Sequence, residues 1–167
     1  MPNSSHIAVM TVEDLHWIEK AVSLSREGMQ SAKGGPFGCV IVKDGQIVGV
    51  GNNAVTSTND PTAHAEVVAI RNACQQLNSF QLDGCTLYTS CEPCPMCLGA
   101  IYWARPDRVV YANTRKDAAA IGFDDDLIYR EIVLSDKQRS IPFEHQPSEE
   151  ALKVFKDWEN MQDKVRY

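Results

Sequence analysis

The first stretch with a regular apolar pattern lies near the beginning of the chain. Its apolar side chains recur every three to four or seven residues, at Leu15, Ile18, Val22 and Met29. This is the period of a helix with one apolar face. Thr11 offers an N-cap, and acidic residues follow it in the first turn. The pattern therefore predicts an amphipathic helix that begins after Thr11 and ends near Gly34-Gly35-Pro36.

The next apolar runs are typical of strands. Two of them cover residues 37–42 and 47–50, and the pair Asp44-Gly45 lies between them. An Asp-Gly pair between two such runs is a strong signal for a tight hairpin. Residues 85–89 and 108–111 form two further short apolar runs. The sequence thus predicts an antiparallel hairpin and two more strands.

Proline marks the beginnings of two further helices. Asp60-Pro61 supplies a polar N-cap and a proline at the first helical position, which predicts a helix to about Leu77. Pro93-Cys94-Pro95 begins another helix, which ends near Ala104. A last helix is expected over about 148–162. This order of elements favours a single α/β domain, a three-layer α/β/α sandwich around a mixed, about five-stranded sheet.

The composition agrees with one globular domain and argues against nucleic acid as a partner. Of the 167 residues, 44% are hydrophobic and 23% are charged, and the net charge is -6. An acidic chain has no general attraction for phosphate backbones. The sequence has neither a leader-like beginning nor a run of about 18 apolar residues. We therefore expect a cytoplasmic protein that binds no nucleic acid and no membrane.

A histidine and two cysteines have the spacing of a metal site. Cys94 and Cys97 are three residues apart, so both sulfurs can lie on one helical face. With His64 they make three protein ligands of the kind that favours zinc, which leaves a fourth tetrahedral position for water. Glu66 lies two residues after His64 and is the candidate acid/base. The pattern H-x-E followed by P-C-x-x-C is the signature of zinc nucleobase deaminases.

Cys91 leaves an alternative open. With Cys94 and Cys97 it forms C-x-x-C-x-x-C, so a closed site with one histidine and three cysteines is conceivable. The chain would then be a non-catalytic, zinc-stabilised binding module. This alternative leaves Glu66 without a purpose.

The chain resembles the bacterial guanine deaminases of the cytidine-deaminase-like superfamily. The stretches that carry the resemblance are residues 34–38, 59–66, 90–97, 101–106 and 121–125. The zinc-binding stretches are shared across the superfamily and bear only on the type of reaction. The resemblance implies hydrolytic deamination of guanine to xanthine and ammonia by zinc-activated water. The alternatives within the same chemistry are guanosine, cytosine and adenosine in tRNA.

The resemblance also implies which residues hold the purine. The implied substrate contacts are Phe37, Asn53, Ala65, Trp103, Asp125 and Tyr167. The candidate catalytic residues are Glu66 and Asp125. Phe37 and Trp103 would be apolar walls for a flat base, Asn53 would hydrogen-bond it, and Asp125 would accept from its amino or ring N–H groups. Asp125 lies within the run 124–126, so Asp124 and Asp126 are the neighbouring alternatives for this contact.

A homodimer follows from the same resemblance. The C-terminal segment, about 148–167, would cross to the partner subunit, where Tyr167 would close the other active site. Phe155 and Trp158 are three residues apart, so they lie on one face of the last predicted helix. That face could pack on a partner or on the chain's own core.

Overall fold

The sheet is formed within the first of two units into which the chain divides. The computed structural model describes residues 10–123 and 125–167. One unit comprises residues 1–125 and the other comprises residues 126–167. Each unit is described by itself below.

The strands of the first unit form one mixed sheet. The antiparallel hairpin of β1 (Gly38–Lys43) and β2 (Gln46–Asn52) is confirmed, and its turn holds Asp44-Gly45 with positive φ at both residues. β3 (Cys85–Cys91) pairs antiparallel with β1. β4 (Arg108–Asn113) pairs parallel with β3. The strand order is therefore β2-β1-β3-β4.

The described part of the chain has four strands, where about five were expected. The stretch after β4 forms a helix, α5 (Arg115–Ala120), instead of a further strand. The Asp117 carboxylate accepts a hydrogen bond from the Thr114 backbone N–H at 2.8 Å, which closes the first turn. Three consecutive alanines then favour the helical conformation.

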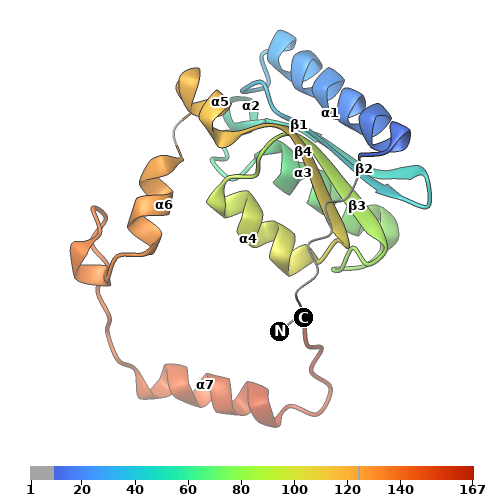
Figure 1. The fold of residues 1–167 in the computed structure, drawn as a ribbon. Helices are drawn as coiled ribbons and strands as arrows, with labels where there is room; N and C mark the ends of the chain where they lie inside the picture. Colours follow the sequence, from blue (N-terminus) through green and yellow to red (C-terminus); the bar gives the residue numbers. More distant parts are fainter. Residues whose placement is uncertain (1–9, 124) are drawn as a thin grey trace, which may run out of the picture. The chain divides into compact units, whose positions relative to one another are not determined.

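Helices cover both faces of the sheet, as the three-layer prediction required. The helix α1 (Val12–Gln30) packs on one face, where Ala21 joins Val40 and Tyr88 in a buried cluster. The helices α3 (Ala65–Leu77) and α4 (Pro95–Ala104) pack on the other face. Figure 1 shows α1 and the α3–α4 pair on opposite sides of the strands.

The buried face of α1 differs from the predicted apolar stripe. Three of the four stripe positions are exposed, namely Leu15, Val22 and Met29. The buried positions are Asp14, Ala21 and Gly28. The helix lies so close to the sheet that a Cβ at Gly28 would be 2.8 Å from the Cβ of Asn52. Small residues are therefore needed where the helix comes closest to the sheet, and the larger Trp17, Ile18 and Leu24 pack partly buried beside this contact.

The helix predicted from Asp60 begins at Ala65, with His64 as its N-cap. Asp60 instead closes a turn, because its Oδ1 accepts from the backbone N–H of Thr62 at 2.8 Å and also from the Thr62 hydroxyl. The preceding stretch contains the short helix α2 (Val55–Thr58). The shift puts His64 at the very beginning of α3.

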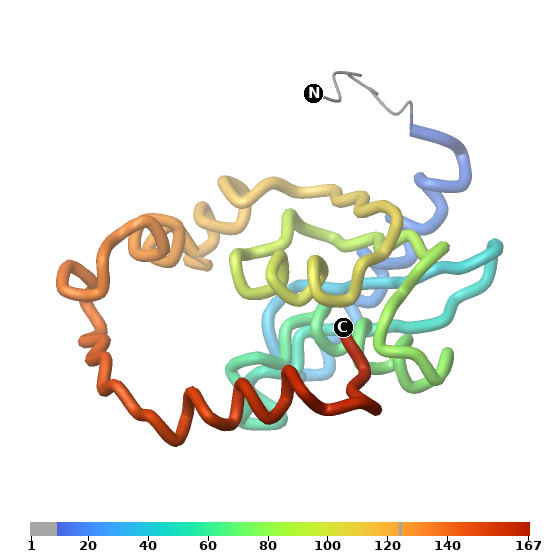
Figure 2. Tube along the Cα trace, turned by 90° about the horizontal axis from the view of Figure 1, so that it is seen from below, coloured from blue at the N-terminus to red at the C-terminus, as the bar shows by residue number. Residues whose placement is uncertain are grey.

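The second unit contains two helices joined by an extended stretch, which Figure 2 follows from orange to red. These are α6 (Asp126–Ile132) and α7 (Glu149–Asn160), with a short 3-10 turn, η1 (Asp136–Gln138), between them. The Ser148 hydroxyl caps α7 by accepting from the Ala151 backbone N–H at 3.2 Å. The predicted last helix is confirmed. Among the described residues, no helix has the length and apolar character needed to cross a membrane.

A buried ion pair fastens α1 to the sheet. The Asp14 carboxylate accepts two hydrogen bonds from the Arg108 guanidinium, at 2.7 and 3.0 Å, and one from the Tyr88 hydroxyl at 2.9 Å. Asp14 is 1% exposed. The guanidinium holds the pKa of Asp14 well below its ordinary value, although burial acts in the opposite direction. The charged form of Asp14 is therefore favoured in the folded protein.

Replacing Asp14 by Asn should reduce the free energy of unfolding at pH 7 by about 2 kcal/mol, because Arg108 loses its charged partner. A carboxyl whose pKa is lowered by folding stabilises the fold above its unfolded pKa of about 3.9 and loses this contribution as the pH falls toward the folded pKa. The difference between wild type and D14N should therefore narrow below about pH 4. Urea unfolding at several pH values measures it. The exposed turn variant D44N is the control, and equal stability of D14N and wild type at pH 7 would contradict the prediction.

Candidate metal centre and adjoining pocket

Two of the three candidate ligands are the N-cap residues of neighbouring helices. His64 caps α3, and Cys94 caps α4, where Pro95 occupies the first helical position. The Cys94 sulfur accepts a hydrogen bond from the Cys97 backbone N–H at 3.5 Å. Both helices pack on the same face of the sheet, so their first turns meet. The beginnings of α3 and α4 therefore bring His64 and Cys94 together.

The ligand atoms have the separations of a tetrahedral zinc site. The Nδ1 of His64 lies 3.6 Å from the Cys94 sulfur and 3.5 Å from the Cys97 sulfur. Zinc bonds of about 2.1 Å to nitrogen and 2.3 Å to sulfur, at a tetrahedral angle, put the two atoms about 3.6 Å apart. All three ligand atoms lie within 4.8 Å of one another. The residues present therefore fit this metal.

The electrostatics of the ligand set also favour a cation. Hydrogen bonds from Cys97 and His64 lower the pKa of Cys94 to about 4. The pKa of Cys97 is raised, because its neighbour Cys94 already carries negative charge and because Cys97 is buried. The pKa of His64 is raised, chiefly by its hydrogen bond to Cys94. The Cys94 thiolate is thus available to bind a cation, and a bound cation would also favour loss of the Cys97 proton.

Cys91 does not belong to the described ligand cluster, which consists of His64, Cys94 and Cys97. Its thiol instead donates to the backbone carbonyl of Thr114, at 3.6 Å. Burial also raises the pKa of Cys91 to about 11. The open three-ligand arrangement is therefore favoured over the closed site.

Glu66 lies beside the ligands without being one of them. It occupies the first turn of α3 and is 5% exposed. Its Oε2 accepts from the Cys97 thiol at 3.4 Å, and its Oε1 accepts from the Thr89 hydroxyl at 2.9 Å. Burial raises the pKa of Glu66 above its usual value, although these hydrogen bonds act in the opposite direction. A carboxyl group in this state can both take and return a proton.

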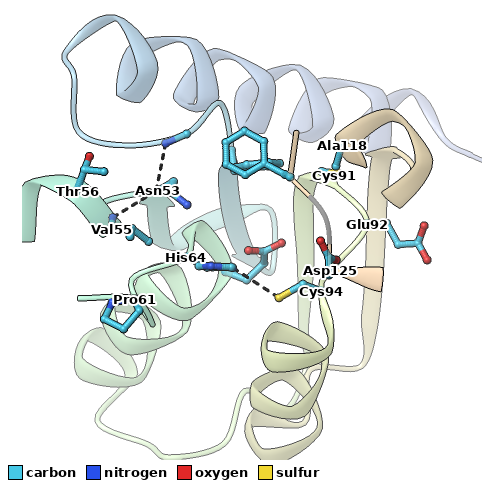
Figure 3. A pocket seen from close by; sticks show the side chains of 14 residues that line it. Asn53, Val55, Thr56, Pro61, His64, Cys91, Glu92, Cys94, Ala118 and Asp125 are labelled. Atoms are coloured by element: carbon cyan, nitrogen blue, oxygen red, sulfur yellow. Dashed lines mark hydrogen bonds between the residues drawn. The ribbon is translucent and has the colours of Figure 1, made fainter. Parts of the chain in front are cut away.

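A cavity of about 310 Å³ adjoins the metal centre. Its lining is mainly apolar. Among its lining residues are Phe37, Asn53, His64, Glu66, Phe123 and Asp125. Figure 3 shows Asn53 and Val55 on one side, Cys94 and Asp125 on the other, and His64 between them. The volume lies at the small end of the range for ligand pockets.

The side chain of Asn53 is held in one orientation. Its Oδ1 accepts from the backbone N–H groups of Gly35, at 3.2 Å, and Val55, at 3.3 Å. With the carbonyl end engaged, the amide presents its NH₂ end as the remaining donor. Gly34 makes this arrangement possible, because a Cβ there would be 2.1 Å from the Asn53 Oδ1.

The structure brings most of the predicted site residues together. His64, Glu66 and Cys94 line the cavity with Phe37 and Asn53. Cys97 and Ala65 lie behind this wall, both fully buried. Asp125 lines the cavity, whereas Asp126 begins α6 in the other unit, and Asp124 lies outside the described residues.

Three predicted substrate contacts are not among the lining residues, namely Trp103, Tyr167 and the fully buried Ala65. Trp103 lies on α4 and is 64% exposed, and Tyr167 belongs to the second unit. Sequence reasoning missed Phe123, which lines the cavity and meets the ring of Phe37 edge to face, with centroids 4.8 Å apart. The signal that could have found it is its place in the stretch 121–125, which carries part of the family resemblance.

The fold and the site together define a metal-dependent deaminase domain. Residues 11–113 match the family described as the cytidine and deoxycytidylate deaminase zinc-binding region. This chain belongs to that family, and the resemblance seen in the sequence is confirmed.

Individual relatives agree with this membership. Guanine deaminase from Bacillus subtilis is 56% identical over 151 residues, which cover 90% of this chain and 97% of the relative. Its X-ray structure matches with a TM-score of 0.90 over 92% of this chain and 98% of that one. A tRNA-specific adenosine deaminase from Aquifex aeolicus is 44% identical over 48% of this chain and 54% of the relative. A solved complex with 2,6-diaminopurine has 32% identity and a TM-score of 0.64, over 70% of this chain and 64% of that one.

The two kinds of cysteine should differ in metal content. Replacing Cys97 by Ser removes a soft ligand, so the purified protein should lose most of its bound metal. Replacing Cys91 by Ser should leave the metal content of wild type, because Cys91 contacts a backbone carbonyl instead of the ligand cluster. Elemental analysis after dialysis measures metal per chain. Loss of metal from C91S to the extent seen in C97S would restore the closed-site alternative.

Proposed function

We propose that this chain hydrolyses guanine to xanthine and ammonia, with zinc as its metal. One observation carries the proposal: an open ligand set of His64, Cys94 and Cys97 lies beside a buried Glu66, at the wall of a small cavity. The similarity to the Bacillus subtilis guanine deaminase, which extends over nearly both chains, supports guanine as the substrate.

The ligand set suits zinc better than a hard cation. One imidazole nitrogen and two sulfurs are ligands that zinc accepts, whereas magnesium and calcium prefer oxygen. When bound, zinc supplies Lewis acidity that lowers the pKa of a water molecule to about 7. His64 and Cys94 reach the site from two different helices, so they fix it between α3 and α4.

The cavity offers complementary groups to a flat purine. The Asn53 amide presents its NH₂ end, which suits a base acceptor such as a carbonyl oxygen or ring nitrogen of guanine. The Asp125 carboxylate, on the other side of the cavity, suits the amino and ring N–H donors. The rings of Phe37 and Phe123 supply apolar surface between these polar groups.

Glu66 is the group that moves protons. It takes a proton from the attacking water, delivers one to the ring nitrogen next to C2, and then helps to protonate the departing amine. Water adds at C2 and the exocyclic amine leaves as ammonia, so guanine and water give xanthine and ammonia. The raised pKa of Glu66 suits this exchange, because an acid/base works best when its pKa approaches the working pH.

A panel of bases and nucleosides tests the substrate. The zinc-loaded protein should release ammonia from guanine with the highest kcat/KM, and much more slowly from guanosine, cytosine and adenosine. The small cavity supports the base over the nucleoside, because ribose needs additional space. Ammonia release from each compound at matched concentration gives the comparison. A clear preference for guanosine would overturn the choice of substrate, and no release from any compound would favour a binding module.

Replacing Glu66 by Gln should lower kcat for guanine by about 10² to 10⁴ while the zinc content stays that of wild type. The amide has nearly the same shape but cannot exchange protons. Stopped assays of xanthine formation and elemental analysis on the same preparation measure the two quantities. E13Q is a matched control, because the exposed Glu13 carboxylate on α1 accepts from the Trp17 indole N–H at 3.3 Å and is not among the residues that line the cavity. Full turnover by zinc-loaded E66Q would refute the assignment.

We further propose a homodimer in which the segment 148–167 crosses to the partner and Tyr167 closes the partner's pocket. The apolar face of α7 supports this, because Phe155 is 73% and Trp158 is 43% exposed. Such a face gains free energy when another surface covers it. The proposal rests on the family resemblance for the role of Tyr167.

Complementation between two inactive variants tests the exchange of tails. E66Q lacks the proton carrier and Y167A lacks the closing ring, so each alone should be slow. A mixed dimer contains one pocket with the Glu66 of one chain and the Tyr167 of the other. Co-refolded mixtures should therefore recover activity well above either variant. Absence of recovery, with mixed dimers demonstrated by mass spectrometry, would indicate a tail that folds back on its own chain.

A further inference from the structure

Thr89 occupies an unusual place for a polar side chain. It lies on β3 between Cys39 of β1 and Tyr111 of β4, and it is fully buried. Its side chain shares a face of the sheet with Leu87, in the cluster that α3 and α4 cover. A valine would suit such an environment better, so the hydroxyl needs an explanation of its own.

The hydroxyl has one favourable acceptor, the Oε1 of Glu66, at 2.9 Å. The carbonyl oxygen of Gly38 lies at 3.5 Å, beyond the usual length of such a bond. Since a hydroxyl carries a single proton, it serves the nearer oxygen. Thr89 therefore acts on the proposed proton carrier from the sheet, while the metal ligands act on it from the helices.

The two oxygens of Glu66 are consequently distinguished. Oε1 is held by Thr89, and Oε2 lies 3.4 Å from the Cys97 sulfur. When Cys97 ligates a metal as a thiolate, it has no proton to donate, so Oε2 loses its hydrogen bond from the Cys97 thiol. One oxygen then stays fixed to the sheet and the other faces the metal side.

From this geometry we propose that Thr89 is a positioning residue for the deamination. It holds one oxygen of Glu66 so that the other oxygen is presented, in one orientation, to the water and the ring nitrogen. Free rotation of the carboxyl group would exchange the two oxygens and reduce the time spent in the reactive arrangement. The inference rests on the proposed function of Glu66, but it concerns a residue outside the metal-binding motif.

Substitutions at Thr89 separate positioning from packing. T89V removes the hydroxyl and keeps the shape, and T89S keeps the hydroxyl and loses a methyl group. We expect T89V to lower kcat for guanine by about ten- to hundredfold, with KM and zinc per chain within about twofold of wild type. T89S should regain most of kcat. T86V, on the same strand but with its side chain on the opposite face, should match wild type.

Other outcomes would overturn the proposal. A T89V protein with wild-type kcat shows that the hydroxyl has no role in positioning. Loss of zinc in T89V, or T89S as impaired as T89V, shows a structural role instead. If T89V does not fold, T89A removes the same hydroxyl without overpacking, and wild-type kcat in T89A has the same meaning. Failure of wild type to deaminate guanine would refute the proposed function. The role of Thr89 is refuted separately, by variants that keep the kcat of an active wild type.

Discussion

The site depends on the meeting of two helix beginnings on one face of the sheet. His64 and Cys94 are both N-cap residues, so the position of each ligand is set by where its helix begins. Close packing fixes α3, because a Cβ at Gly51 would be 2.2 Å from the carbonyl oxygen of Ala65, and α4 buries Ile101 and Ala104 in the same core. A shift of either helix along the sheet would separate the nitrogen from the sulfurs. The positions of the candidate ligands therefore depend directly on the packing of the core.

Polar groups on the two faces of β3 have different tasks. On one face, Tyr88 donates to Asp14 and joins Arg108 in holding α1. On the other face, Thr89 donates to Glu66 beside the ligands. Adjacent residues of one strand thus anchor a structural ion pair and a reactive carboxyl group. Successive side chains of a strand point to opposite faces, so the sheet separates the Asp14–Arg108 ion pair from the Glu66 carboxyl group.

The sequence predicted the ligands better than the elements that carry them. The spacing of Cys94 and Cys97 is local to α4. It does not depend on where α3 begins, which the sequence misplaced by four residues. That error arose because Asp60-Pro61 resembles a helix cap, although Asp60 closes a turn. The predicted buried face of α1 was also wrong. The close approach at Gly28 depends on how the helix lies against the sheet, which the hydrophobic pattern of the helix does not show. The contact of Phe123 with Phe37 could not be predicted, because it joins parts of the chain that are distant in sequence.

The cavity is lined by residues from within the family match and by residues that follow it. The family match ends at residue 113, and it includes every candidate ligand together with Glu66. Ala118, Phe123 and Asp125, which line the same cavity, come after it. A descendant could therefore exchange this short outer wall for another while inheriting the reactive centre intact. Changes of substrate range that arise in this segment would leave the candidate ligands and Glu66 untouched, whereas changes at Phe37 or Asn53 would alter the part of the pocket that the family match includes.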